Sequence, residues 1–336
     1  MDSLSYTELH RVFAADIDME TDAALDKLAS SGSEVKSAVA GLLRHQKLRH
    51  PLSVLPLLVH GAETGDPRPA VPLAAVHVLW WTSACYLDDL ADTGMVGAKR
   101  TVTDAAQGAT PHPHEALLAS VVAGHVLPLE ILRSLPTPET VRGTLTAEAL
   151  RCAAAAAEGQ LADLRGDAAN ATRKTVLDIY RGKSSAPFAM ITAMAAALSG
   201  AAPERTTLWR EFGSVFGILW QLFNDQEDIL TGRNEDLSNG TVTYLLACAL
   251  EAGPPEVTER VLDLHAAASG SVQARDELGA LLLAPANVRR LEEDLTSFRT
   301  DAHKILARLS GPSEYTAALA RLVDEASTLH LCRHEV

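Results

Sequence analysis

Three carboxylates lie close together in the segment Asp88-Asp89-Leu90-Ala91-Asp92. In an α-helix, residues four positions apart lie about 40° apart around the axis and one turn apart along it, so the side chains of Asp88 and Asp92 can converge on one cation. The segment ends a run, from residue 72 to residue 87, that contains no Asp, Glu, Lys or Arg. Carboxylates at the end of such an apolar helix are costly to bury unless they are paired or bind a metal. The spacing therefore indicates a metal site, and the alternative is a helix end with solvated aspartates.

A second acidic group, Asn224-Asp225-Gln226-Glu227-Asp228, follows the apolar stretch VFGILWQLF. Asn224 and Asp228 share one helix face by the four-residue spacing, and Glu227 is adjacent. Oxygen ligands of this kind suit Mg²⁺ better than zinc. Because Mg²⁺ usually binds through a few carboxylates plus phosphate oxygens, two such groups on separate apolar helices predict a shared cavity for an anionic substrate, with a diphosphate as the best fit. The candidate metal ligands are Asp88, Asp89, Asp92, Asn224, Glu227 and Asp228.

The charge balance excludes several other classes of partner. The chain has 29 Lys and Arg against 43 Asp and Glu, a formal charge of −14, which would repel nucleic acid and an anionic membrane surface. The cysteines form no C-x-x-C pair, so neither a zinc site nor a disulfide framework is indicated. The first residues show no basic, apolar and small-residue pattern of an export signal. We therefore expect a cytoplasmic protein that binds neither nucleic acid nor membrane.

The sequence pattern predicts that all the elements that position these residues are helices. Hydrophobic residues make up 47% of the chain but aromatics only 4%, which suits close-packed helices better than sheets. Apolar segments of helix length are separated by short Gly, Pro and Ser breaks, without the period-two alternation of strands. The expected helices cover residues 19–45, 51–63, 70–92, 112–134, 137–166, 172–200, 205–230, 240–251, 254–266, 270–281, 286–309 and 312–331. This pattern predicts one all-α domain over residues 1–336, with a single longer loop at 93–111.

Two apolar runs, Leu117 to Leu132 and Ala186 to Pro203, are marginal in length for a membrane span. Each also contains residues that are awkward in a bilayer-spanning helix. We expect both to be buried in a helical bundle and predict no membrane span.

Five motifs, taken in order, resemble those of the polyprenyl synthetase family of class I isoprenoid synthases. The motifs, with the family patterns in parentheses, are Asp88-Asp89-x-x-Asp92 (the first aspartate motif), Ala157-Glu158-Gly159-Gln160-Leu161-Ala162-Asp163-Leu164 (G-Q-x-x-D-L), Arg181-Gly182-Lys183-Ser184-Ser185 (the K-T segment), Phe223-Asn224-Asp225-Gln226-Glu227-Asp228-Ile229-Leu230 (F-Q-x-x-D-D-I-L) and Glu235-Asp236-Leu237-Ser238-Asn239-Gly240 with Thr243 (D-L-x-x-G-K-x-T). The resemblance covers roughly residues 45 to 250. Ordered agreement of several motifs is more specific than any one of them.

The resemblance implies a class I isoprenoid synthase helical bundle around a central cavity, usually a homodimer. It also implies a prenyl diphosphate substrate and a cluster of about three Mg²⁺ ions that neutralise the leaving diphosphate. In the K-T segment the lysine contacts diphosphate, which by resemblance is Lys183. The residues that would carry catalysis are Asp88, Asp92, Lys183 and Asp228.

Two basic segments of the family are altered in this chain. The family's G-K-R-x-R-P segment aligns with Gln46-Lys47-Leu48-Arg49-His50-Pro51, which keeps Lys47 but replaces both arginines in register. The Arg-Arg pair after the first aspartate motif becomes Gly97-Ala98-Lys99-Arg100, displaced by about two residues. Guanidinium groups bind phosphate bidentately and are not replaced by Leu or His without loss. The resemblance therefore implies an intact ionisation site but a weakened site for the isopentenyl diphosphate co-substrate.

The later part of the family pattern is also altered. The second aspartate motif reads Glu227-Asp228-x-x-Thr231, and Thr241 stands where the family has a lysine. The first change removes a carboxylate that would bind metal, and the second removes a cation that would hold diphosphate.

Our leading hypothesis is a Mg²⁺-dependent terpene synthase, a carbon–oxygen lyase that ionises a C15 or C20 allylic prenyl diphosphate, cyclises it and releases diphosphate. One alternative is a head-to-tail prenyl diphosphate synthase that condenses the allylic substrate with isopentenyl diphosphate. Another is prenyl transfer to a non-isoprenoid acceptor. A silent regulatory subunit is a fourth, against which the retained metal ligands argue.

The candidate substrate-binding residues combine cations for diphosphate with aromatic faces that could stabilise a carbocation. They are Lys47, Arg49, Lys99, Arg100, Gln160, Lys183, Arg233, Trp80, Trp81, Ala84, Phe188 and Trp220. For each aromatic the alternative is ordinary core packing. By resemblance, the small residues Ser83 and Ala84 would leave a deep chain pocket. His77 is either a hydrogen-bonded core histidine or a general base.

Overall fold

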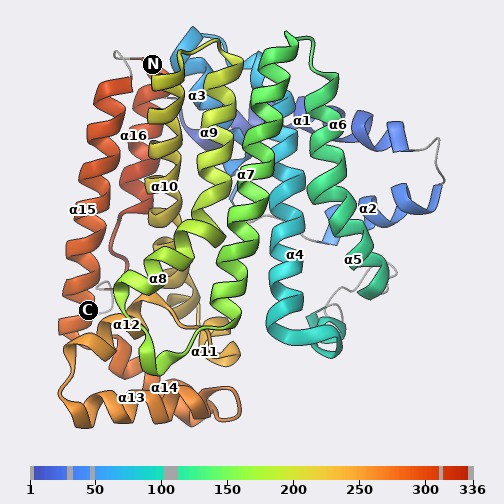
Figure 1. Ribbon diagram of the computed structural model, residues 1–336. Helices are drawn as coiled ribbons and strands as arrows, with labels where there is room; N and C mark the ends of the chain where they lie inside the picture. Colours follow the sequence, from blue (N-terminus) through green and yellow to red (C-terminus); the bar gives the residue numbers. More distant parts are fainter. Residues whose placement is uncertain (1–3, 29–32, 46–49, 102–112, 310–312, 332–336) are drawn as a thin grey trace. The chain divides into compact units, whose positions relative to one another are not determined.

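The computed structural model describes residues 4–28, 33–45, 50–101, 113–309 and 313–331 (Figure 1). Within these ranges every regular element is helical, so the predicted all-α fold is confirmed. The longer elements are α1 (Tyr6–Leu28), α2 (Ser33–His45), α3 (Leu55–Thr64), α4 (Val71–Thr101), α5 (Pro113–Val121), α6 (Leu127–Ser134), α7 (Glu139–Leu164), α8 (Arg173–Tyr180), α9 (Ala186–Leu198), α10 (Pro203–Leu230), α11 (Glu235–Asn239), α12 (Tyr244–Ala252), α13 (Pro255–Ala268), α14 (Val272–Leu282), α15 (Pro285–Leu309) and α16 (Glu314–Ala326). The short elements are the 3-10 turns η2 (Leu52–Val54), η3 (Arg68–Ala70) and η5 (Ala168–Asn170) and the π-helical turns η4 (Val122–Val126) and η6 (Arg181–Ser185).

The chain divides into two compact units, each assembled from several segments. Unit 1 comprises residues 1–152, 190–210 and 309–319, and unit 2 comprises residues 153–189, 211–308 and 320–336. The first acidic motif therefore belongs to unit 1. The second acidic group, Gln160 and Lys183 belong to unit 2.

In unit 1, α4 is the central helix. It packs against α1, α5 and α6, and its residues from Leu73 to Val76 are fully buried. Burying the side chains of Leu73 and Val76 contributes roughly 1.5–3 kcal/mol each, which helps explain why an almost uncharged helix is stable here. Two helical stretches, Arg68–Ala91 and His114–Ser134, are long and apolar enough to span a membrane, but 61% and 50% of the residues in an apolar 18-residue stretch of each are buried, as in core helices of a bundle.

In unit 2, α10 carries a row of aromatic side chains at helical spacing. Phe212 stacks on Phe216 at 6.1 Å, Phe216 lies 6.0 Å from Trp220, and Trp220 stacks on Phe223 at 5.0 Å between ring centroids. The edge of Phe188 meets Phe216 at 5.3 Å. This row supplies much of the unit's large-residue core.

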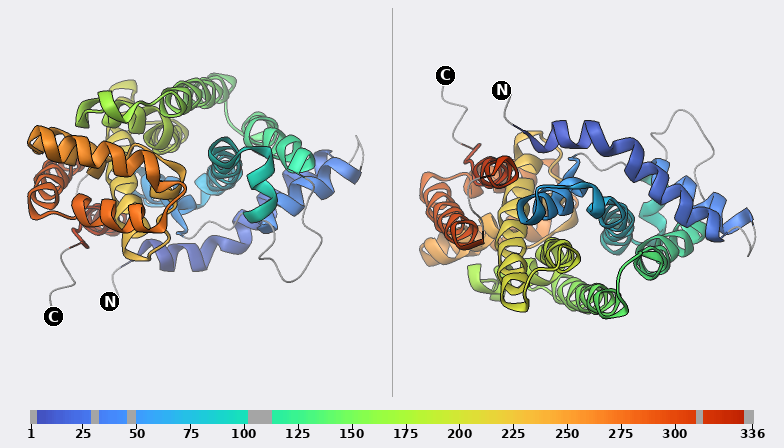
Figure 2. Two further views of the ribbon diagram at one scale, coloured as in Figure 1. Left: turned by 90° about the horizontal axis from the view of Figure 1, so that it is seen from below. Right: turned by 90° about the horizontal axis from the view of Figure 1, so that it is seen from above.

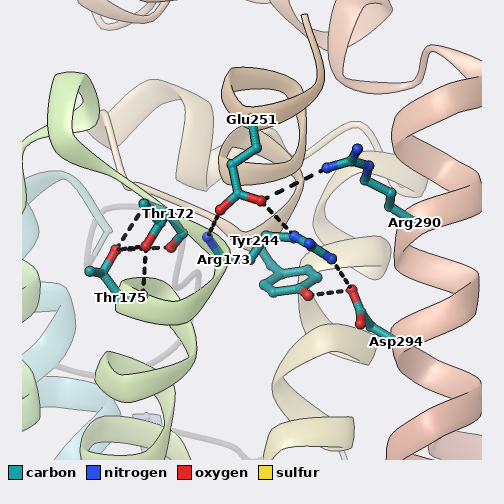
Figure 3. Close-up of polar contacts among 7 residues, drawn as sticks. All are labelled: Thr172, Arg173, Thr175, Tyr244, Glu251, Arg290 and Asp294. Atoms are coloured by element: carbon teal, nitrogen blue, oxygen red, sulfur yellow. Dashed lines mark hydrogen bonds and ion pairs between the residues drawn. The ribbon is translucent and has the colours of Figure 1, made fainter.

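Helices α13 and α14 form an adjacent pair that packs on α12 (Figure 2). The N-terminal part of α8 is tied to α12 and α15 through Arg173, which donates to Glu251 at 2.7 Å and to Asp294 at 2.9 Å (Figure 3). Tyr244 donates to the same carboxylate of Asp294 at 2.5 Å. These polar contacts therefore hold α8, α12 and α15 together.

Several expected boundaries were wrong. The helix expected at 19–45 is instead α1, beginning at Tyr6, and the separate α2; residues 29–32 lie outside the described ranges. The stripe Leu9, Phe13 and Ile17 at four-residue spacing buries the missed first half of α1. The loop expected at 93–111 is helical as far as Thr101, and 102–112 lie outside the described ranges.

Two predicted continuous helices contain π-helical turns. These are η4, between α5 and α6, and η6, between α8 and α9. The helix expected at 240–251 begins only at Tyr244, capped by the Thr243 side chain, and the short α11 precedes it.

Candidate active site

The first acidic motif lies on the long helix α4. Because α4 runs unbroken from Val71 to Thr101, Asp88 and Asp92 share a helix one turn apart, as predicted. Asp88 is half-buried and Asp89 is exposed, whereas the side chain of Asp92 lies outside the described part of the chain. The helix can thus present Asp88 at the boundary between the apolar core and water.

The turn before this motif is packed tightly against η4. The hydroxyl of Ser83 donates to the backbone carbonyl of Ser120 at 2.7 Å, and a Cβ on Gly124 would overlap the Ser83 side chain. Ser83 is therefore used in helix packing, and Ala84 is the half-buried small residue that could border a substrate chain. Trp80 is buried and Trp81 half-buried, with 6.0 Å between their ring centroids.

Deeper along α4, His77 is buried against Trp81, whose ring lies edge-on at 6.1 Å. Burial lowers the pKa of His77 to about 4, and a hydrogen bond at the backbone of Leu52 partly offsets this effect. The imidazole is thus neutral at neutral pH. This geometry favours the core-histidine interpretation over a general base.

The second acidic group occupies the C-terminal end of α10. Asp225 is only 5% exposed, accepts a hydrogen bond from the Tyr180 hydroxyl at 2.6 Å and accepts another from Gln221 at 2.8 Å. Burial raises the pKa of Asp225 to about 6, while these hydrogen bonds act in the opposite direction. Asn224 and Glu227 are half-buried and stand on either side of it in the sequence.

Asp228 closes the turn between α10 and α11. Its two carboxylate oxygens accept the backbone N–H groups of Glu235 at 3.1 Å and Asp236 at 3.2 Å. Arg233 lies beside it, with its Nε 3.8 Å from Asp228 and its terminal nitrogen donating to Glu235 at 2.9 Å. The carboxylate is therefore held by the N-terminus of α11, which favours negative charge, and retains only part of its capacity for a metal. Arg233, predicted to bind substrate, already pairs with carboxylates of its own turn.

A third group lies where α7 meets η6 in unit 2. The ammonium of Lys183 donates to Asp163 at 2.6 Å, and both side chains are mostly buried, at 20% and 11% exposure. Gly159 makes this approach possible, since a Cβ there would overlap the backbone of Gly182 and Lys183. Within the described residues, the buried Nε2 of Gln160 has no hydrogen-bond partner. Unit 2 thus holds a mostly buried cation on η6 and a buried amide donor on α7, both of kinds that bind an anionic ligand.

The predicted metal ligands fit Mg²⁺ by their chemistry. All are carboxylate or amide oxygens, the hard donors that Mg²⁺ takes. No group of three or more His, Cys, Asp or Glu positioned to hold a metal occurs among the described residues. The two acidic groups lie in different units. In unit 1 the described candidate ligand is Asp88, and in unit 2 the candidates are Asn224, Glu227 and the remaining lone pairs of Asp228.

The structure does not describe the side chains of several residues that we predicted to bind substrate. Lys47 and Arg49 lie outside the described ranges, and Lys99 and Arg100 are described only as backbone of α4. The predicted cation-facing aromatics Phe188 and Trp220 are 1% and 4% exposed and packed within the aromatic row of α10. Their role toward a substrate stays a prediction.

Sequence reasoning missed two contributors to this region. Asp163 belongs to the quoted G-Q-x-x-D-L motif, so its position one turn after Gly159 could have indicated a partner for Lys183. Tyr180 carries no such signal, because its partner Asp225 lies far away in the sequence and at a position that the F-Q-x-x-D-D motif leaves free.

Comparisons with solved structures show the same fold. The crystal structure of polyprenyl synthase from Caulobacter crescentus CB15, complexed with calcium and isoprenyl diphosphate, is similar over 97% of this chain and 98% of that chain, with 19% identity and a TM-score of 0.79. Geranylgeranyl pyrophosphate synthase from Corynebacterium glutamicum, complexed with isoprenyl diphosphate and magnesium, is similar over 96% of this chain and 99% of that chain, with 20% identity and a TM-score of 0.77. Geranylgeranyl pyrophosphate synthetase from Pyrococcus horikoshii Ot3 covers 95% of this chain and 99% of its own, with 18% identity and a TM-score of 0.75.

A sequence comparison with curated proteins found no match. The family model of polyprenyl synthetases, in contrast, matches residues 63–280. This region includes the first acidic motif, Gln160, Lys183 and the second acidic group. Because the match covers well over half of the chain, the protein belongs to the polyprenyl synthetase family and is an enzyme.

Proposed function

We propose that the chain is a Mg²⁺-dependent prenyl diphosphate synthase that joins an allylic diphosphate head-to-tail to isopentenyl diphosphate. Whole-length likeness to geranylgeranyl and polyprenyl synthases supports condensation over the cyclisation that leads our sequence hypothesis. The observation that supports the site is the mostly buried ammonium of Lys183, which Asp163 of α7 orients; Gln160, on the same helix as Asp163, has a buried amide donor without a partner in the described residues. In this reaction the carbon–oxygen bond to diphosphate breaks, a carbon–carbon bond to the co-substrate forms and a proton is lost.

The residues of unit 2 would bind and orient the leaving diphosphate. Lys183 would donate charge-assisted hydrogen bonds to it, and Asp163 orients the ammonium by accepting a hydrogen bond from it. The Gln160 amide would add a neutral donor. When bound, Mg²⁺ would supply Lewis-acid stabilisation of the leaving oxygens, and the carboxylates of each acidic group are its candidate ligands. About three ions, homodimer formation and a cytoplasmic location belong to the same proposal.

Cyclisation without a co-substrate is the second candidate, because the sequence replaces both arginines of the family's N-terminal basic segment at residues 46–51. Loss of bidentate phosphate binding would weaken the co-substrate site but leave ionisation untouched. A third outcome, transfer to a different acceptor, would follow if that site were remodelled.

One incubation series distinguishes these functions. Purified protein and Mg²⁺ would be supplied with C10, C15 and C20 allylic diphosphates, each with and without isopentenyl diphosphate, and the products identified by mass spectrometry. We expect an elongated diphosphate only when the co-substrate is present. A cyclic hydrocarbon or alcohol without co-substrate would select cyclisation. Consumption of no substrate under any condition would contradict both.

Oligomeric state is measured separately, by light scattering after size-exclusion chromatography. A mass of two chains is expected.

A further inference from the structure

A hydrogen bond in the core of unit 2 joins the turn that carries Lys183 to the helix end that carries the second acidic group. Tyr180 ends α8 and immediately precedes η6, and its hydroxyl donates to Asp225 at 2.6 Å. Both residues are nearly inaccessible, at 6% and 5% exposure. Burying polar groups so deeply costs free energy of folding unless each of them is hydrogen-bonded.

Both partners are in fact satisfied. The second oxygen of Asp225 accepts from Gln221, one turn earlier on α10, at 2.8 Å. The Tyr180 hydroxyl also accepts the backbone N–H of Tyr244 at 3.1 Å. The bond is therefore part of a connected network across α8, α10 and α12, and its geometry is fixed from both sides.

Two further contacts hold η6 against its neighbours. On one side Gly182 lies against Gly159 of α7, and a Cβ on Gly182 would come within 2.9 Å of the Gly159 Cα. On the other side Ser185 donates to the backbone carbonyl of Ser214 on α10 at 2.7 Å. The π-helical turn is thus held at both ends of its span, with Lys183 in the middle. π-helical turns within helices are frequent at functional sites.

We propose that Tyr180 is a positioning residue of the diphosphate site: by binding Asp225 it sets the acidic end of α10 in register with Lys183. Asn224 directly precedes Asp225 and Glu227 follows two residues later, all in the last turns of α10, so a contact that fixes Asp225 also fixes the backbone that carries them. Asp225 itself faces Tyr180 and Gln221, which gives it a role distinct from that of the ligands beside it. This inference rests on the proposed function, because it assumes that Lys183 and the acidic end of α10 bind the same diphosphate.

The test compares Tyr180→Phe and Asp225→Leu, which remove the bond from its two sides, with the wild type. Binding of inorganic diphosphate in the presence of Mg²⁺ is measured by calorimetry, and kcat and KM are measured separately. We expect each variant to weaken diphosphate binding by about tenfold or more, since small displacements of positioning groups are costly. Asp225→Asn, which keeps an acceptor for the Tyr180 hydroxyl, should restore binding close to that of the wild type.

Tyr244→Phe provides the matched control. It removes another buried tyrosine-to-aspartate bond of unit 2, the 2.5 Å contact with Asp294 (Figure 3). We expect it to lower the melting temperature without changing diphosphate binding. Equal loss of binding in Tyr244→Phe would show a general stability effect and overturn the inference.

Each of the remaining outcomes also tests either the inference or the proposed function. If Tyr180→Phe and Asp225→Leu fold, by near-UV circular dichroism, and bind diphosphate like the wild type, the inference is wrong. If neither folds, the pair is structural and the inference is equally wrong. If the wild type itself binds no diphosphate with Mg²⁺, the proposed function has failed instead, which keeps the two failures distinguishable.

Discussion

At the scale of single residues, Lys183 is the cation that the structure places best for an anionic ligand. Its ion pair with Asp163 is short and mostly buried, so the ammonium is already desolvated and oriented. Exposed pairs of the same type, such as Lys174 with Asp178 on α8, stay solvated and contribute at most about 1 kcal/mol. The contrast makes Lys174 a natural control for Lys183.

Replacing Lys183 by Ala should therefore lower kcat/KM for the allylic diphosphate by about tenfold to a hundredfold, the range of one hydrogen bond to a charged group. Lys174→Ala, which removes a lysine from an exposed lysine–aspartate pair, should leave kcat/KM unchanged. Steady-state kinetics at saturating Mg²⁺ would measure both. An active Lys183→Ala enzyme would remove Lys183 from the diphosphate site.

His77 gives a prediction about stability rather than activity. Its pKa is about 6.5 in the unfolded chain and about 4 when folded, because burial disfavours the charged form. Between these values the unfolded chain binds more protons, so the free energy of unfolding falls as the pH falls. From pH 7.5 to pH 5 this single group should cost about 2 kcal/mol.

Urea unfolding at the two pH values would measure that difference. His77→Gln should reduce the pH dependence by about the same 2 kcal/mol. Identical pH dependence in His77→Gln and the wild type would contradict the buried, neutral state.

At the scale of elements, the contact between α7 and η6 depends on glycine. A Cβ on Gly159 would meet only backbone atoms, among them the Gly182 carbonyl carbon at 2.7 Å, and backbone cannot move aside as a flexible side chain can. Gly159→Ala should therefore lower the free energy of unfolding by about 1–3 kcal/mol and displace Lys183.

Gly143 on the same helix is the matched control, because nothing lies within 4 Å of a Cβ placed there. Gly143→Ala should instead raise the free energy of unfolding by about 0.5–1 kcal/mol, through the better helix propensity of Ala. Urea unfolding of the two variants would compare them. A stabilised Gly159→Ala protein would show that the two elements do not approach as closely as described.

The elements also show what sequence reasoning can and cannot reach. The pairing of Asp88 with Asp92 on one helix follows from local geometry, because helical periodicity acts over a few residues. The hydrogen bond between Tyr180 and Asp225 joins residues 45 positions apart in the sequence, so helical periodicity, which acts over a few residues, cannot predict it. The π-helical turn η6 is similarly unmarked, since only packing against α7 and α10 decides it. The metal-ligand set and the single-domain organisation stay predictions.

At the scale of the whole molecule, the net charge of −14 divides between a solvated surface and acidic groups drawn toward the core. Asp225 and Asp228 are each 5% exposed, and the second is balanced by Arg233 and by the N-terminus of α11. Carboxylates that are close together repel one another, so a divalent cation that neutralises them should stabilise the folded state.

Mg²⁺ and diphosphate together should therefore raise the melting temperature, while each alone should do so much less. A ligand present at about one hundred times its Kd adds about 2.7 kcal/mol to the free energy of unfolding, provided that it binds only the folded chain. Chelation by EDTA should abolish both this stabilisation and turnover, and renewed Mg²⁺ should restore both. Glu227→Gln should diminish the joint effect, because it removes a charged oxygen donor from the half-buried end of α10. Stabilisation by diphosphate that persists in excess EDTA would mean that Lys183 and its neighbours bind the anion without any metal.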